Sequence, residues 1–229
     1  MAMLCTNGGI QTGLTTPIST VTPLTSMLWV LLGPNTSPSA RNWWYLAGEV
    51  GLLVGTTSDG KTLQLTIGST NYVGGPLPIG QWFHFAVSVQ PLSGGSSQQI
   101  KVHINGVLQI TATNSSPQGY GTILLGYASS SGNTVAIESY KMWTGYTLSP
   151  QGIREESRTR NARRRAGLYC WYPLETAPFC YGTTSFTFYM LDKSGYNRTT
   201  SQAGVGPYTS VSGPVLPFCE HKRNSIYVD

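Results

Sequence analysis

Apolar and polar residues alternate on both sides of an Asn-Gly pair in the run IKVHINGVLQI, residues 100–110. A type I′ turn needs positive φ at both central residues, so Asn105-Gly106 between two half-apolar runs predicts a β-hairpin. Side chains alternate with period two, so apolar residues fall on both faces and we expect both faces to be partly covered. The register predicts three facing pairs: Ile104 with Val107, Val102 with Gln109, and His103 with Leu108.

Short strand-like runs bounded by turn residues recur along most of the chain. Gly, Pro, Ser and Asn clusters such as GPNTSPSA, PLSGGSSQ and TNSSPQGYG separate them. Many short strands at near-regular spacing, with no long amphipathic helix between them, predict an all-β sandwich or barrel. The expected strands are 26–32, 42–55, 62–67, 81–90, 99–104, 107–112, 122–128 and 135–143.

One short helix is predicted after these strands, in SPQGIREESRTRNARRRAG, residues 149–167. Ser149 suits the N-cap and Pro150 the first helical position, while Glu155 and Glu156 are expected near the positive end of the helix dipole. The arginines at 163–165 would then lie toward the negative end. The apolar stripe is thin, which predicts a helix that lies on a surface and does not build a core.

The charge of the chain is concentrated in this predicted helix. The 229 residues favour one large all-β domain, only 10% of them are charged, and the formal net charge is +5. Residues 149–167 hold six Arg and two Glu, which is +4 of that charge. No basic face is distributed along the chain to follow a phosphate backbone, so nucleic acid is not an expected partner.

The arginine run has two readings, a solvated surface helix or a contact with a neighbouring protein subunit. The assembly-contact candidates are Arg154, Arg158, Arg160, Arg163, Arg164 and Arg165.

The cysteines and the apolar runs limit the remaining classes. We expect no signal peptide and no membrane span, because no apolar run has the required length. Four cysteines permit three pairings, and without a secretory signal we expect free thiols at Cys5, Cys170, Cys180 and Cys219. No C-x-x-C spacing supports zinc, so neither a metal nor another cofactor is expected.

The order of four segments resembles the laminin-G-like domain of the concanavalin A-like lectin and glucanase superfamily. These are GPLPIGQWFHFAVSV, the hairpin HINGVLQ, GTILLGYASS, and VAIESYKMWTGYTLSPQGI, within residues 27–153. The resemblance implies an all-β jelly-roll sandwich of two curved antiparallel sheets, with Trp82, His84, Asn105 and Gly106 in framework positions. The family often has an acidic residue paired with an aliphatic one before its last strand, and here only Glu138 is available. No Asp pair matches a calcium site, so the resemblance implies no metal.

Residues 167–204 resemble the opening of such a domain, although they follow its last strand. A second jelly-roll of about 60 residues could not close. The segment therefore either completes its own sandwich or lends strands to a neighbour. We divide the chain into a jelly-roll (1–153), an Arg-rich helix or linker (154–167) and a C-terminal β extension (168–229).

The acidic residues argue against an enzyme. Glycoside hydrolysis needs two carboxylates flanking the scissile bond, and outside the predicted helix the acids stand alone in the sequence. A G-x-S-x-G nucleophile elbow and a P-loop are also absent from the sequence. We therefore predict a non-catalytic protein.

Binding is the functional class that the residues favour. Trp43, Trp44 and Tyr45 lie beside a Gly-rich run and could stack on sugar rings, and Asp59, Asn71 and Tyr72 could add contacts from loops. The alternative is that alternate members of the Trp-Trp-Tyr run fill the core. We expect Trp82 and Trp143 in the core, and His84 as a packed strand residue rather than a base.

These features together predict a displayed binding module. Low charge, a lectin-like fold and a strand-lending tail suggest a virion surface component, such as a phage capsid decoration or tail-associated protein, with glycan adhesion. Its partners would be other protein subunits of a capsid or tail lattice, or further copies of the chain, together with a cell-surface glycan. The alternative is a free, extracellular carbohydrate-binding lectin, and a glycoside-active enzyme ranks third.

Overall fold

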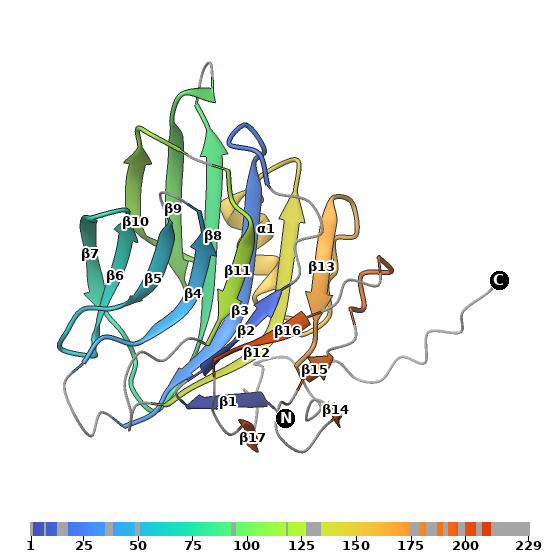
Figure 1. Cartoon of the computed structure of the whole chain (residues 1–229). Coiled ribbons are helices and arrows are strands. Elements are labelled where there is room, and N and C mark those ends of the chain that lie inside the picture. Colours follow the sequence, from blue (N-terminus) through green and yellow to red (C-terminus); the bar gives the residue numbers. More distant parts are fainter. Residues whose placement is uncertain are drawn as a thin grey trace.

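Two antiparallel β-sheets form two layers in the computed structural model of the chain (Figure 1). The structure describes residues 2–211 apart from 7, 13–17, 35–38, 49–50, 93–94, 118, 127–133, 175–178, 182–186, 190–191, 197–199 and 205–207. This architecture is the predicted all-β sandwich, and the expected strands and short helix are present.

The first sheet has eight strands in the order β10-β9-β8-β3-β12-β1-β17, with β13 also paired to β12. These strands are β10 (Val107–Asn114), β9 (Gln98–Ile104), β8 (Trp82–Pro91), β3 (Leu24–Leu32), β12 (Thr134–Thr144), β1 (Ala2–Thr6), β17 (Tyr208–Val211) and β13 (Leu168–Tyr172).

The second sheet has seven strands in the order β16-β2-β11-β4-β5-β6-β7. These strands are β16 (Thr200–Gly204), β2 (Gly8–Thr12), β11 (Thr122–Leu125), β4 (Asn42–Ala47), β5 (Leu52–Thr56), β6 (Thr62–Ile67) and β7 (Thr70–Pro76). A separate pair joins β14 (Phe179–Tyr181) to β15 (Thr187–Tyr189). The predicted strand 42–55 is thus two strands, β4 and β5.

The C-terminal segment pairs with strands of its own chain. β13 lies beside β12, β16 pairs with β2, and β17 pairs with β1. The segment therefore adds strands to both sheets: β16 and β17 join strands from the first 12 residues of the chain, and β13 joins β12.

The main core lies between the two sheets and contains apolar side chains from both. The indole Nε1 of Trp44 on β4 donates to the Ser26 hydroxyl on β3 at 2.8 Å, and that hydroxyl donates to the Tyr140 phenol at 3.2 Å. A polar bridge thus joins the sheets in the core, where an unpaired indole N–H would be costly.

A second apolar cluster covers the outer face of the eight-stranded sheet. Met27 of β3, Ala86 of β8 and Trp143 of β12 are buried there together with Ile153 of α1 and Trp171 of β13. α1 (Pro150–Glu156) therefore builds a small core, and the prediction of a merely surface-lying helix is wrong.

The helix is also shorter than predicted, although its start is confirmed. Ser149 is the N-cap, and its hydroxyl accepts a hydrogen bond from Gly152 N at 3.1 Å. The helix ends at Glu156, so Glu155 and Glu156 lie in its last turn, and the arginines at 163–165 lie outside it. The buried Lys141 ammonium binds the Glu156 carbonyl oxygen at 3.1 Å and so satisfies an acceptor at the helix end.

The framework residues implied by the resemblance have different environments. His84 is buried against the Trp29 ring at 5.3 Å between centroids, which confirms a packed strand residue. Trp143 is buried as expected, but in the second cluster. Trp82 is only half-buried at the start of β8, so its predicted core position is wrong.

The Asn-Gly hairpin is confirmed at its turn. Asn105 and Gly106 have φ of 51° and 76°, and Ile104 pairs with Val107 as predicted. A bulge after Leu108 then places Ile110, and not Gln109, opposite Val102. Since β10 is the edge strand, Val107 and Leu108 are 60% and 49% exposed, so the expectation that both faces are covered is wrong here.

Asn105 also holds the hairpin against β8, because its Oδ1 accepts a hydrogen bond from His84 N at 2.8 Å. We expect Asn105→Ala to lower the free energy of unfolding by about 2 kcal/mol, since Ala resists positive φ and the bond is lost. Urea unfolding would measure this. Asn105→Gly is the control: it keeps the turn conformation and should lose only the side-chain bond. Equal stability of Asn105→Ala and the wild type would contradict this explanation.

Within the described residues, Cys170 is buried and forms no disulfide bond. The side chains of Cys5, Cys180 and Cys219 lie outside the described set. Across the same residues, no three His, Cys, Asp or Glu side chains are grouped to hold a metal ion. Nor does any described helix have the length and apolar character needed to span a membrane.

Candidate functional site

Trp43 and Trp44 are fully buried, at 0% exposure each. A bulge between Asn42 and Trp44 breaks the alternation of β4, so both consecutive rings point into the core. Trp43 packs edge-on against Phe83 and Phe85 of β8, with centroids 5.7 and 6.0 Å away. Neither indole can stack on a ligand from this position, so the core alternative holds for both residues.

Tyr45 follows the bulge and lies on the outer face of the seven-stranded sheet. Its cross-strand partners are Leu124 on β11 and Leu53 on β5. Leu53 pairs with Thr66 on β6, and Thr66 pairs with Asn71 on β7. The strand register therefore makes one continuous row across five strands: Leu124, Tyr45, Leu53, Thr66 and Asn71. Asn71 is exposed and the other four are half-buried, whereas their strand neighbours Trp44, Leu52 and Leu65 are buried.

Hydrogen bonds hold the β6–β7 end of this row in place. Gln64 Nε2 donates to Thr66 Oγ1 at 3.0 Å and to Asn71 Oδ1 at 3.1 Å. The Thr66 hydroxyl donates to the same Asn71 oxygen at 2.8 Å. This network uses the Gln64 amide nitrogen and the Asn71 carbonyl, so the Gln64 carbonyl and the Asn71 amide nitrogen can bind a ligand.

Two glycines let the β4 side chains lie close against β5. A Cβ at Gly51 would lie 2.6 Å from Tyr45 Cε2, and a Cβ at Gly55 would clash with Asn42 Oδ1. The Tyr45 ring and the Asn42 amide thus lie over glycine backbone. We name the outer-face residues Asn42, Tyr45, Leu53, Gln64, Thr66 and Asn71 the sheet platform.

Tyr72 and Asp59 are not part of the sheet platform. Tyr72 pairs with Leu65 and packs, half-buried, against the main core. Asp59 lies in the exposed β5–β6 turn, where its carboxylate accepts hydrogen bonds from Thr57 Oγ1, Thr62 Oγ1 and the backbone nitrogens of Lys61 and Thr62. These bonds, the Thr57 hydroxyl first, hold the pKa of Asp59 well below its usual range. Both of its oxygens are engaged within the turn.

The sequence-predicted arginines lie over the outer face of the other sheet. Five of them are exposed: Arg154, Arg158, Arg163, Arg164 and Arg165. Arg160 differs, because its Nε forms an ion pair with the fully buried Glu138 at 3.1 Å. Arg160 therefore anchors the segment to β12 and has little freedom to contact a partner.

A bulge in β12 creates the buried ionic anchor of this segment. Ser139 has φ of 53°, and the register shift between Glu138 and Lys141 puts both of these side chains on the outer face. Lys141 Nζ bonds Glu156 Oε2 at 3.0 Å and the Thr159 carbonyl at 2.8 Å. No local sequence pattern predicts this pair, because 15 residues separate its members and it depends on a bulge.

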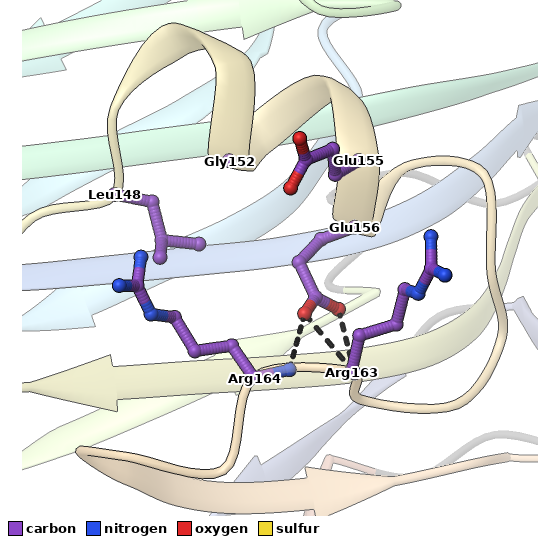
Figure 2. A pocket seen from close by; sticks show the side chains of 6 residues that line it. All are labelled: Leu148, Gly152, Glu155, Glu156, Arg163 and Arg164. Atoms are coloured by element: carbon purple, nitrogen blue, oxygen red, sulfur yellow. Dashed lines mark hydrogen bonds between the residues drawn. The ribbon is translucent and has the colours of Figure 1, made fainter.

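A surface pocket of about 300 Å³ opens beside this anchor (Figure 2). Its lining consists of Leu148, Gly152, Glu155, Glu156, Arg163 and Arg164. Figure 2 shows the Glu156 carboxylate pointing at the backbone of Arg163 and Arg164, and the two guanidinium groups on either side of it. Glu156 Oε1 accepts hydrogen bonds from Arg163 N at 3.0 Å and Arg164 N at 2.7 Å. Both oxygens of Glu156 are thus bound to Lys141 or to backbone amides, so this carboxylate stabilises the segment and does not bind a ligand.

These two sites lie on opposite outer faces of a two-sheet antiparallel β-sandwich. No family model matches the chain, and no curated protein matches it. The chain is similar in fold to a solved protein of Bacteroides ovatus for which carbohydrate binding has been proposed, with a TM-score of 0.61 at 14% sequence identity. The similarity covers 92% of this chain and 61% of that one, so this chain spans less than two thirds of that protein.

Two further solved structures have lower similarity. Domain 4 of an extracellular arabinanase from Geobacillus stearothermophilus, in complex with arabinotriose, has a TM-score of 0.42 at 22% identity, over 65% of this chain and 72% of that one. The binding domain of botulinum neurotoxin DC, in complex with rat synaptotagmin II, has a TM-score of 0.49 at 12% identity, over 62% and 37%.

Proposed function

We propose that this chain is a carbohydrate-binding module whose ligand lies on the sheet platform. The main support for this proposal is the row of Tyr45, Leu53, Thr66 and Asn71. It aligns an aromatic ring, an apolar side chain, a hydroxyl and an amide on one outer face. Sugar rings stack on aromatic faces, and sugar hydroxyls pair with amide and hydroxyl groups. The Tyr45 ring and the Gln64–Thr66–Asn71 network supply both kinds of contact in preformed positions.

The fold is compatible with this role but does not assign it, since one fold can carry many functions. The Bacteroides ovatus protein has the same fold and a proposed carbohydrate ligand. The assignment for this chain rests on its own sheet platform. A non-catalytic role is part of this proposal: the polar groups of the platform are the amides of Asn42, Gln64 and Asn71 and the hydroxyls of Tyr45 and Thr66, which suit binding.

The second part of the proposal is display on a larger assembly, for which a virion surface is the context we favour. The exposed arginines support it: they lie on the outer face of the eight-stranded sheet, on the opposite side of the sandwich from the sheet platform. A module attached through one side would present the other side to a glycan. Its partners would then be protein subunits of the assembly and a cell-surface glycan; a free extracellular lectin is the alternative.

A matched pair of threonine variants tests the sheet platform. We expect Thr66→Ala to weaken binding of the best glycan from an array about threefold to tenfold, because one hydrogen-bonding group and its network are lost. Thr111→Ala makes the same chemical change at an exposed position of β10 on the other sheet and should leave affinity unchanged. Isothermal titration calorimetry would measure both. Equal affinities of the two variants would contradict this location.

A further inference from the structure

The backbone that carries Arg163, Arg164 and Arg165 is held in one position by contacts on both sides. The buried Glu156 carboxylate accepts the amide protons of Arg163 and Arg164. On the other side, Trp143 Nε1 donates to the Arg164 carbonyl at 2.9 Å, and Leu168 N donates to the Arg165 carbonyl at 3.0 Å. Three consecutive cations are therefore presented from a fixed backbone.

Aromatic rings orient two of the three guanidinium groups. Arg164 Cζ lies 5.4 Å from the centroid of the Tyr146 ring, and Arg165 Cζ lies 5.0 Å from that of Trp171. In the part of the chain that the structure describes, no carboxylate forms an ion pair with Arg163, Arg164 or Arg165. Their charge is available to a partner, and less side-chain entropy is lost on binding because two of the groups are already oriented.

The pocket beside them has mixed character. Leu148 provides an apolar wall, and Arg163 and Arg164 provide cations (Figure 2). Of the two lining carboxylates, Glu156 is paired with the buried Lys141, so Glu155 leaves one unpaired negative charge at the rim. Glu155 is held there by the Gln151 amide, which donates to its Oε1 at 2.8 Å. Nucleic acid or a sulfated polysaccharide would meet repulsion from Glu155 and needs a longer basic stripe. A protein segment with charges of both signs can place a cation beside Glu155 and an anion beside the arginines, and it needs only a small site.

We infer that this pocket receives an acidic side chain of a partner protein, with its carboxylate between Arg163 and Arg164 and a basic neighbour facing Glu155. The inference rests on the proposed attachment to an assembly and names the chemistry of the contact. A second copy of this chain is a poor donor: of the five acids with described side chains, Glu138, Glu156 and Asp192 are buried and Asp59 is engaged in its turn. Among the described side chains only Glu155 is left, and it already lines this pocket, so we assign the carboxylate to a different protein.

Gly152 offers a way to close the pocket without changing any charge. The nearest side-chain atoms that a Cβ at this position would meet are Ser149 Oγ at 3.5 Å and Leu148 Cβ and Cδ2 at 3.7 Å, which are ordinary contacts. Gly152→Leu should therefore fold, since Leu favours a helix over Gly, and should fill the pocket. Arg164→Gln removes one pocket cation. Arg154→Gln removes an exposed cation that is not among the pocket residues and is the matched control.

The experiment is an NMR titration of the ¹⁵N-labelled full chain with the capped tetrapeptide Ala-Glu-Ala-Lys, which has no net charge. We expect saturable shifts of the Nε–H signals of Arg163 and Arg164, and no shifts with Ala-Gln-Ala-Lys. Gly152→Leu and Arg164→Gln should each weaken binding about tenfold, and Arg154→Gln less than twofold.

Three results would overturn the inference: shifts that do not saturate, equal losses in Arg154→Gln and Arg164→Gln, or tighter binding of octathymidylate or a heparin hexasaccharide than of the peptide. The glycan titration with Thr66→Ala probes the other sheet. The peptide titration therefore tests the pocket, and the glycan titration tests the sheet platform, so a negative result in one does not depend on the other.

Discussion

Lowering the pH from 7.5 to 5 is expected to reduce the free energy of unfolding by about 4 kcal/mol, because two histidines are buried in their neutral form. Burial, with Lys141 and His103 nearby, lowers the pKa of His84 to about 3. Burial, with Lys101 and Arg154 nearby, lowers the pKa of His103 to about 4. Both imidazoles are buried and have cations nearby, so neither accepts a proton easily while the chain is folded.

Acid lowers the free energy of unfolding because histidine in the unfolded chain has a pKa of about 6.5, well above its value in the folded chain. Below that value the unfolded state binds protons that the folded state refuses, so stability is full above pH 6.5 and falls as the pH drops toward 4. Two such groups give a slope of about 2.7 kcal/mol per pH unit near pH 5. The loss should end as the folded histidines themselves become protonated, between about pH 4 and 3.

His84→Phe separates this effect from general acid denaturation. The Nδ1 atom of His84 has no hydrogen-bond partner within the described chain, and the ring packs edge-on against Trp29, so phenylalanine keeps the packing. Urea unfolding at several pH values should show about half the wild-type loss between pH 7.5 and 5. An unchanged pH dependence in His84→Phe would rule out this histidine as a source of acid sensitivity.

Glu156→Gln is expected to reduce the free energy of unfolding by about 3–5 kcal/mol, because it leaves the buried Lys141 ammonium without its counter-charge. Lys141 and Glu156 are each 2% exposed, and Nζ lies 3.0 Å from Oε2. The carboxylate also binds two backbone amides of the arginine segment, so its loss should loosen residues 163–164.

Two comparisons make this prediction specific to the buried pair. Glu155→Gln removes the same charge one residue earlier, at an exposed position, and should cost less than about 0.5 kcal/mol. The double variant Lys141→Met/Glu156→Leu removes both charges and should be more stable than Glu156→Gln. Chemical denaturation of all three would measure the differences. Equal effects of Glu155→Gln and Glu156→Gln would contradict the assignment of a buried ion pair.

Local patterns predicted most of the first half of the fold. Turn chemistry placed Asn105-Gly106 correctly, and the run TLQLTI coincides with β6 at both ends. The strands near the N-terminus and β7 were not predicted, because GGIQT and TNYVGGP lack the regular apolar alternation of a half-buried strand. Their positions are set by pairing with distant partners.

Bulges explain the main differences at the candidate site. Period-two reasoning leaves one of two consecutive tryptophans facing outward, but the bulge at Asn42–Trp44 buries both. The bulge in β12 likewise brings Glu138 and Lys141 to one face, where they hold Arg160 and Glu156. A bulge adds one residue to one strand and reverses every later side chain, and it has no reliable sequence signal.

The sequence indicates Tyr45 and Asn71 as binding candidates for separate reasons, and the strand register places them in one row. The intervening Leu53 and Thr66 were missed, since nothing local marks them as outward-facing. The predicted arginines are exposed except Arg160. The pocket between α1 and Arg163–Arg164 could not be predicted from the sequence, because its shape depends on the path of the loop that follows the helix.

The most direct test of the central claim is a glycan array probed with the wild-type chain and with Tyr45→Ala. We expect the wild type to bind at least one glycan family with a saturable signal that free glycan competes away. Folded Tyr45→Ala should lose that signal, because it removes the aromatic ring of the sheet platform. A wild type without any competable signal, or a Tyr45→Ala signal equal to that of the wild type, would contradict carbohydrate binding at this face.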